Sequence, residues 1–135
     1  MPEWNIPRNL QELIDADSPD GDGIWEDTSW EPILLTVMAG SSYDERDIPL
    51  AWQIEFEPSD ARLTDASKKI VAFGVDADGY GWAKVIESVF AKYHPTLADE
   101  LHFGDTDAAA CVVWVESEST CKTLTEVVWT LISSK

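Results

Sequence analysis

The residues that come closest to a metal site lie between Asp76 and Glu87. A calcium-binding EF-hand loop carries acids at positions 1 and 3, glycine at position 6 and glutamate at position 12. Asp76, Asp78, Gly81 and Glu87 match these positions, but position 5 is aromatic and position 9 is a lysine. We therefore expect no metal site and interpret the segment as a turn in which Asp78 caps a helix. A metal-dependent hydrolase using Asp76, Asp78 and Glu87 is the minor alternative.

Other reactive side chains form no recognisable catalytic pattern. His94 and His102 stand eight residues apart without a cysteine or acidic helix partner at zinc-ligand spacing. Cys111 lies in an apolar run and Cys121 at an inward-facing helical spacing, so both are predicted to be buried, reduced thiols. No serine has a nucleophile-elbow context, and no glycine loop with a lysine is present to hold phosphate. These observations predict a protein without enzymatic activity or cofactor.

Negative charge is concentrated in the N-terminal half. The 135 residues include 26 acids and 9 bases, which give a formal net charge of −17. Between Arg8 and Arg46 there are ten acids and no base. So negative a surface repels phosphate backbones and anionic lipid, which strongly disfavours direct nucleic-acid or membrane binding.

Two features of the sequence predict where in the cell the protein is found. No apolar run approaches the roughly 20 residues that a membrane helix needs. The first residues lack the basic and apolar regions of a secretory signal. We therefore expect a cytoplasmic protein.

Seven tryptophans are many for this length. Trp52, Trp82 and Trp114 fit core positions by their periodicity. Trp25, Trp30 and Trp129 do not. An aromatic anchor rimmed by carboxylates suits a basic protein partner, with half-buried packing of the same segment as the alternative. The predicted partner-binding residues are Asp20, Asp22, Trp25, Glu26, Asp27, Trp30 and Glu31.

Hydrophobic periodicity predicts a mixture of strands and helices. Strands are expected over residues 33–38 and 48–56, and a polar turn is expected to join strands at 101–103 and 111–115. The fully apolar run at 111–115 indicates a central strand. Helices are expected over 7–14, over 63–74 with a strand at 70–75 as the alternative, over 82–93, and from Ser117 or Ser119 to the C-terminal end.

These elements occur in clusters and do not alternate regularly. Clustering favours an antiparallel sheet over a doubly wound parallel one. The prediction is an α+β fold in which residues 1–135 form a single domain, mainly an antiparallel sheet with helices packed on one face.

The second half of the chain resembles the immunity protein 51 family of bacterial polymorphic toxin systems. The resemblance rests on Gly79, Tyr80, Gly81 and Trp82 before an amphipathic helix, then on the segment 101–105, an apolar strand and a final helix. It covers roughly residues 76–135, less than half of the chain. It implies a small α+β cytoplasmic protein that binds and neutralises a cognate toxin, and it supplies no catalytic residues. The matching glycine and aromatic residues are interpreted as structural residues of the fold.

Charge and resemblance together predict an inhibitor that docks an acidic surface on a toxin, with a nuclease as one candidate. Carboxylates would then occupy a basic cleft in place of nucleic acid. The alternative is an acidic DNA mimic that inhibits a nucleic-acid-binding protein, and this alternative predicts binding to several basic proteins. The oligomeric state is left open by the sequence.

Overall fold

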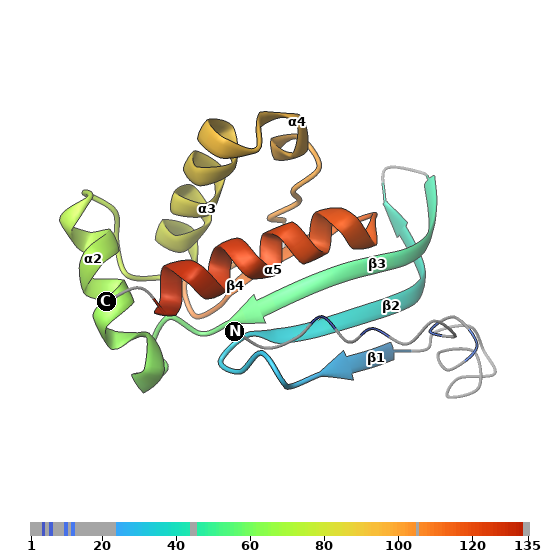
Figure 1. The fold of residues 1–135 in the computed structure, drawn as a ribbon, viewed down its shortest axis with the longest axis horizontal. Coiled ribbons are helices and arrows are strands. Elements are labelled where there is room, and N and C mark those ends of the chain that lie inside the picture. Colours follow the sequence, from blue (N-terminus) through green and yellow to red (C-terminus); the bar gives the residue numbers. More distant parts are fainter. Residues whose placement is uncertain are drawn as a thin grey trace.

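A four-stranded antiparallel sheet, in the order β1-β2-β3-β4, forms the centre of the molecule (Figure 1). The computed structural model describes residues 4, 6, 10, 12, 24–43, 46–104 and 106–133, without the side chains of 39–49. The strands are β1 (Ile24–Asp27), β2 (Leu34–Tyr43), β3 (Arg46–Phe56) and β4 (Cys111–Val115). The helices are η1 (Ala61–Leu63), α2 (Thr64–Ala72), α3 (Gly79–Tyr93), α4 (Pro95–Ala98) and α5 (Glu118–Ser133). The predicted α+β class, with helices packed against an antiparallel sheet, is confirmed.

Side chains along β2 and β3 point alternately to a face of the sheet that helices cover and to a face without described helices. Val37 pairs with Trp52 and Leu35 with Ile54, and all four side chains are buried beneath the helices. Figure 1 shows α5 crossing this face, with α2 and α3 towards one end of the sheet. The predicted strands at 33–38 and 48–56 are confirmed, and both extend into a longer hairpin.

The position predicted for β4 is wrong, because this strand lies at the edge of the sheet. Its five residues are nevertheless all buried, because the preceding segment covers its outer side. The backbones of His102 and Trp114 exchange two hydrogen bonds of 3.0 Å, and the Thr106 hydroxyl bonds the backbone N–H and carbonyl of Val112. The strand expected at 101–103 is likewise wrong, because only this isolated bridge forms there.

Local features of the sequence set the ends of α3 and the start of α5. The Asp78 carboxylate caps α3 by accepting a 2.8 Å hydrogen bond from the Gly81 N–H, and Pro95 follows its C-terminal end. Ser117 accepts a 3.3 Å hydrogen bond from the Thr120 N–H and so caps α5. Residues 64–72 form the predicted helix and not the alternative strand. The helix expected over 7–14 lies largely outside the described residues, although Leu10 within it is buried.

Tryptophans join the N-terminal segment, the sheet and α5. Trp4 packs at 6.5 Å on Trp52 and at 6.3 Å on Trp30, and Trp30 meets Trp129 of α5 edge to face at 5.7 Å. Trp30 is only 1% exposed, so its expected place outside the core is wrong. It lies in a turn after β1, where no periodicity marks an inward direction. The core positions predicted for Trp52, Trp82 and Trp114 are confirmed.

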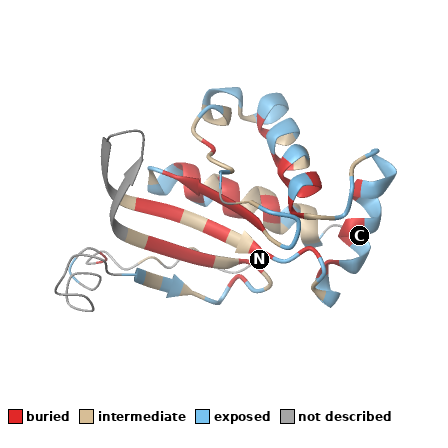
Figure 2. Cartoon of the chain, turned by 180° about the vertical axis from the view of Figure 1, so that it is seen from behind, coloured by how far each residue is buried: buried red, intermediate tan, exposed pale blue. Residues whose placement is uncertain are grey.

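The opposite face of the sheet carries no described helix (Figure 2). Ala51 and Trp114 are buried there in a small apolar cluster, separate from the main core, with Met38 packed against it. His102 stacks on Trp114 with ring centroids 4.0 Å apart, and its side chain is only 18% exposed.

Gly79 should tolerate no side chain. A Cβ atom there would overlap the backbone carbonyl oxygens of Asp107 and Ala110, against which the first turn of α3 packs. We expect Gly79→Ala to lower the free energy of unfolding by about 1–3 kcal/mol, as overpacking does. Denaturant titration measures this loss. Gly104→Ala is the matched control, because no atom lies within 4 Å of its Cβ position. Equal stability of the two variants would contradict the packing assigned to the start of α3.

Candidate functional site

The end of β1 presents carboxylates on the described edge of the sheet. Glu26 is exposed, and Asp27 turns its carboxylate onto the following turn. The Ser29 backbone N–H donates to Asp27 Oδ1 at 2.9 Å, and the Ser29 hydroxyl donates to the same atom. Asp27 therefore orders the turn that leads to Trp30, while Glu26 keeps its charge exposed to solvent.

A second group of carboxylates lies beside this turn. Because Leu34 pairs with Glu55, the start of β2 and the end of β3 meet at one end of the sheet. The chain then enters η1, which brings further charged side chains to the same place. The result is a shallow recess of about 270 Å³, and we call its charged residues the acidic recess. They are Glu31, Glu55, Glu57, Asp60 and Arg62.

Arg62 organises the acidic recess. Its Nε and Nη2 atoms donate to the two oxygens of Asp60 at 3.0 and 2.8 Å, and Nη1 donates to Glu31 Oε2 at 3.3 Å. Hydrogen bonds from the Arg62 side chain and backbone lower the pKa of Asp60 to about 2. The same pairing raises the pKa of Arg62 above its usual value.

The acidic recess keeps an excess of negative charge. Four carboxylates surround one guanidinium, which leaves three formal negative charges. The Glu31 and Arg62 side chains are 60% and 54% exposed. Exposed pairs contribute little to folding stability. These pairs fix the direction in which the carboxylates of Asp60 and Glu31 point. The three excess negative charges give this end of the sheet a negative field.

The structure brings together only part of the predicted interface. Glu26 and Glu31 lie on the surface, and Trp25 is half-buried against the main core. Trp30 is enclosed in the core and has no surface to offer a partner. Asp20 and Asp22 lie outside the described residues.

Sequence reasoning missed three carboxylates of the recess. Glu55, Glu57 and Asp60 lie within six residues of one another, a density that was visible in the sequence. Their approach to Glu31 depends on the pairing of β2 with β3, which the sequence pattern did not specify.

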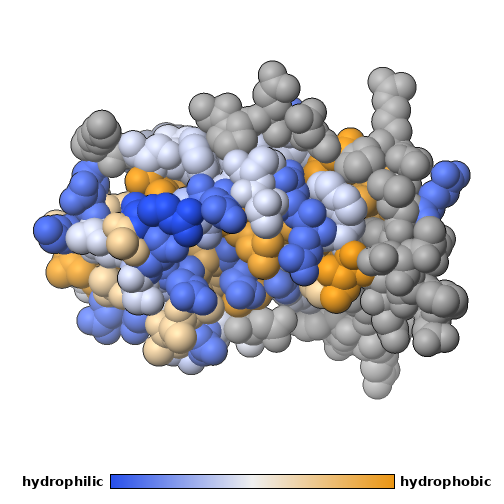
Figure 3. Space-filling view, turned by 90° about the horizontal axis from the view of Figure 1, so that it is seen from below, coloured by the Kyte–Doolittle hydropathy of each residue, from blue (hydrophilic) through white to orange (hydrophobic). Residues whose placement is uncertain are grey.

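Figure 3 shows how hydrophilic and hydrophobic residues are distributed on one side of the molecule. Hydrophilic residues dominate its described part, and hydrophobic residues appear as separate patches between them. Such a surface combines hydrophilic side chains with places where apolar side chains can be buried on association.

The metal motif does not form an EF-hand loop. Helix α3 begins at Gly79, so the helical backbone already occupies the motif's fourth position and continues to Glu87. Asp78 is used as the helix cap, and Glu87 is exposed further along the helix. Within the described ranges, no group of three or more histidine, cysteine or acidic side chains is arranged to hold a metal ion.

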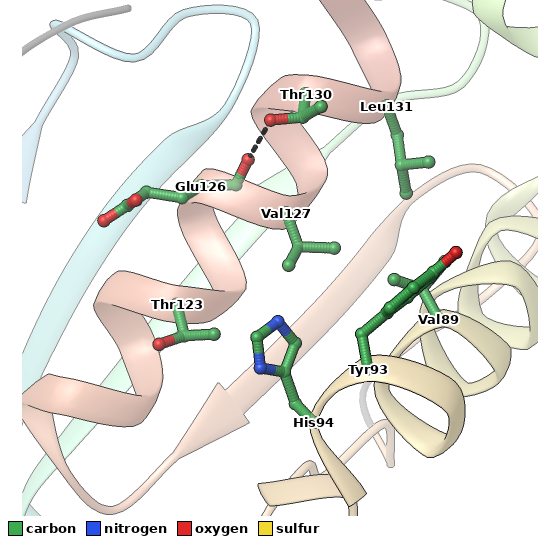
Figure 4. Close-up of a pocket in the computed structure, with 8 residues that line it drawn as sticks. All are labelled: Val89, Tyr93, His94, Thr123, Glu126, Val127, Thr130 and Leu131. Carbon is green, nitrogen blue, oxygen red and sulfur yellow. Dashed lines mark hydrogen bonds between the residues drawn. The ribbon is translucent and has the colours of Figure 1, made fainter.

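A larger groove of about 500 Å³ separates the end of α3 from α5 (Figure 4). Val89, Tyr93, Val127 and Leu131 give it a mainly apolar lining. The His94 ring projects into the groove, whereas the Glu126 carboxylate points away from it (Figure 4). The groove therefore brings no acid–base pair together, and its lining is mainly apolar.

Both cysteines are free and buried, as predicted. Burial raises the pKa of the Cys111 thiol to about 12 and that of the Cys121 thiol to about 12. A thiol with so high a pKa is protonated at neutral pH and is a poor nucleophile.

Comparisons with known proteins supply no family for this chain. A scan against protein-family models and searches of curated proteins and solved structures find no match. None of the helices in the described part of the chain is both long and apolar enough to cross a membrane.

Thiol labelling tests the buried environment of the cysteines. With pKa values of about 12, only about one thiol in ten thousand is ionised at pH 8. We expect iodoacetamide to leave the native protein unlabelled while it labels both cysteines in guanidinium chloride. Mass spectrometry counts the labels, and glutathione in the same solution controls for reagent activity. Rapid labelling of the native protein would show that the thiols are accessible.

Proposed function

We propose that this chain is a non-enzymatic inhibitor that binds a basic protein, a cognate bacterial toxin, through its acidic surface. The observation that carries the proposal is the acidic recess, where four carboxylates face one guanidinium at an exposed end of the sheet. Glu26 extends this negative surface along β1. The resemblance of residues 76–135 to an immunity-protein family gives the partner its class, although no family model matches the chain.

The inhibitor would act by occupying a surface that the toxin needs. If the toxin is a nuclease, its cleft carries lysine and arginine side chains that hold phosphates. Carboxylates held in fixed positions, as Asp60 is by Arg62, satisfy the same cations without offering a bond to cleave. Opposite fields also accelerate encounter and favour partners of the right charge.

An acidic DNA mimic is the second candidate, because the same net charge of −17 would attract many nucleic-acid-binding proteins. The two candidates differ in selectivity. A cognate inhibitor neutralises one toxin, whereas a mimic binds several basic proteins with similar affinity.

Expression of the adjacent reading frame tests the proposal. We expect its product alone to stop bacterial growth and co-expression of this chain to restore it. The two purified proteins should form a complex, and two unrelated basic nucleases serve as selectivity controls. A harmless neighbouring product, or a toxic one that this chain does not neutralise, would contradict the proposal. Equal binding to the unrelated nucleases would favour the DNA mimic.

Charge neutralisation tests the role of the acidic surface. Changing Glu26, Glu31, Glu55 and Glu57 together to glutamine should slow association with that toxin by about tenfold or more at low salt, and it should flatten the salt dependence. The matched control neutralises four exposed acids on or beside the helices, namely Asp65, Asp76, Glu87 and Asp99. Stopped-flow fluorescence measures both rates. An equal effect of the control set would assign the result to net charge and contradict a localised acidic interface.

A further inference from the structure

We infer that the helix-free face of the sheet is the docking surface for the basic protein partner, with an apolar centre that takes aliphatic or aromatic side chains and an acidic rim that takes lysine or arginine. This inference rests on the proposed function and adds to it the surface and the chemistry of the contact. We call this surface the open face. Its centre is Met38, Ala51 and Trp114, and its rim is Glu26, Glu55 and Glu116.

The strand register places the three central side chains together. Met38 pairs with Ala51, and Trp114 pairs with Gln53, two residues along β3 from Ala51. Side chains two residues apart on one strand share a face of the sheet. Ala51 and Trp114 accordingly form an apolar cluster separate from the main core, with Met38 packed against it.

At the centre of the open face, Ala51 and Trp114 are buried, and the ring of His102 stacks on Trp114. No described helix lies over this centre, and Figure 2 shows β2 and β3 from the uncovered side. Met38 remains half-buried. Its pairing partner on β1, Ile24, is 48% exposed. A partner can therefore bury further apolar area at this place, which is the main source of binding free energy in protein interfaces.

The rim surrounds this centre on three sides. Glu26 pairs with Thr36 on the β1 side, and Glu55 pairs with Leu34 towards one end of the sheet. Glu116 follows β4, and its Oε2 lies 3.6 Å from Nε2 of His102, the ring that stacks on Trp114. Strands are spaced about 4.8 Å apart, so the carboxylates on β1 and beside β4 stand roughly 15 Å apart across the centre.

Charge selects the class of occupant. The six lysine and arginine residues whose side chains are described all belong to η1 or to α2, α3 and α5. The described side chains of the open face therefore include carboxylates but no lysine or arginine. Nucleic acid and anionic membranes would be repelled, and a second copy of this chain would set acidic rim against acidic rim. A protein with apolar side chains flanked by lysine or arginine is complementary to both parts of the surface.

The open face is continuous with the acidic recess. Glu55 belongs to both, since it projects from the open face of β3 and also lines the recess with Glu31 and Arg62. A single partner can therefore contact the apolar centre and the recess together. The groove between α3 and α5 lies on the helix side of the sheet and belongs to neither.

Arginine substitutions on the two sides of the molecule test this inference against the toxin encoded by the adjacent frame. Met38→Arg and Glu26→Arg change an apolar and an acidic residue of the open face. Tyr93→Arg and Glu87→Arg are their matches on α3, where Tyr93 is 64% exposed and lines the groove. We expect each open-face variant to weaken binding by about tenfold or more and each α3 variant by less than about threefold.

Calorimetric titration gives the affinities, and thermal melting followed by circular dichroism checks that each variant is folded. Glu26 is exposed, so Glu26→Arg keeps the test decisive if Met38→Arg fails to fold. Full binding by folded open-face variants, together with loss of binding in the α3 variants, would overturn the inference and assign the interface to the groove. Failure of the unmodified chain to neutralise the toxin would instead overturn the proposed function, and this inference with it. A dimer of the free chain that Met38→Arg abolishes would assign the open face to a second copy and also overturn the inference.

Discussion

The packing of α5 against one face of the sheet is the interaction on which the rest of the structure depends. Cys121, Leu124 and Val128 of α5 are completely buried, as are Leu35 and Ile54 on the strands beneath. Trp30 meets Trp129 of α5 and so ties the turn after β1 to the same core. The described helices gather on this face, and the other face carries the separate small cluster of Ala51 and Trp114. The apolar centre and the acidic rim of the open face both follow from this one-sided arrangement.

Much of the fold could be predicted from the hydrophobic periodicity and from the residues that begin and end each element. The alternation along β3 and the stripe of Trp82, Ile86 and Phe90 on α3 each pointed to one buried face, and both elements form as expected. The position of β4 could not be predicted in this way. An apolar run shows that a strand is buried but not what buries it, and here the segment around His102 and Thr106 covers an edge strand.

The candidate site was less accessible to sequence reasoning, because long-range pairing assembles it. The segment from Trp25 to Glu31 drew attention by composition, yet its two tryptophans pack on the core side. Its exposed carboxylates are those of Glu26 and Glu31. Pairing of Leu34 with Glu55 adds the carboxylates of β3 and η1, and Arg62 then orders them. Composition thus indicated the charge of the surface, whereas strand register decided which charges act together and which apolar residues lie between them.

Methyl cross-saturation by nuclear magnetic resonance tests the central claim most directly, because it reports contact by single side chains in the intact complex. With the deuterated chain bound to the protonated toxin from the adjacent reading frame, irradiation of the toxin should reduce the signals of the Ile24 and Met38 methyl groups. The methyl groups of Val89 and Leu131, which line the groove between α3 and α5, should keep their intensity. Saturation of Val89 and Leu131 with unchanged Ile24 and Met38 signals would contradict the account, because the partner would then sit on the helix side of the sheet.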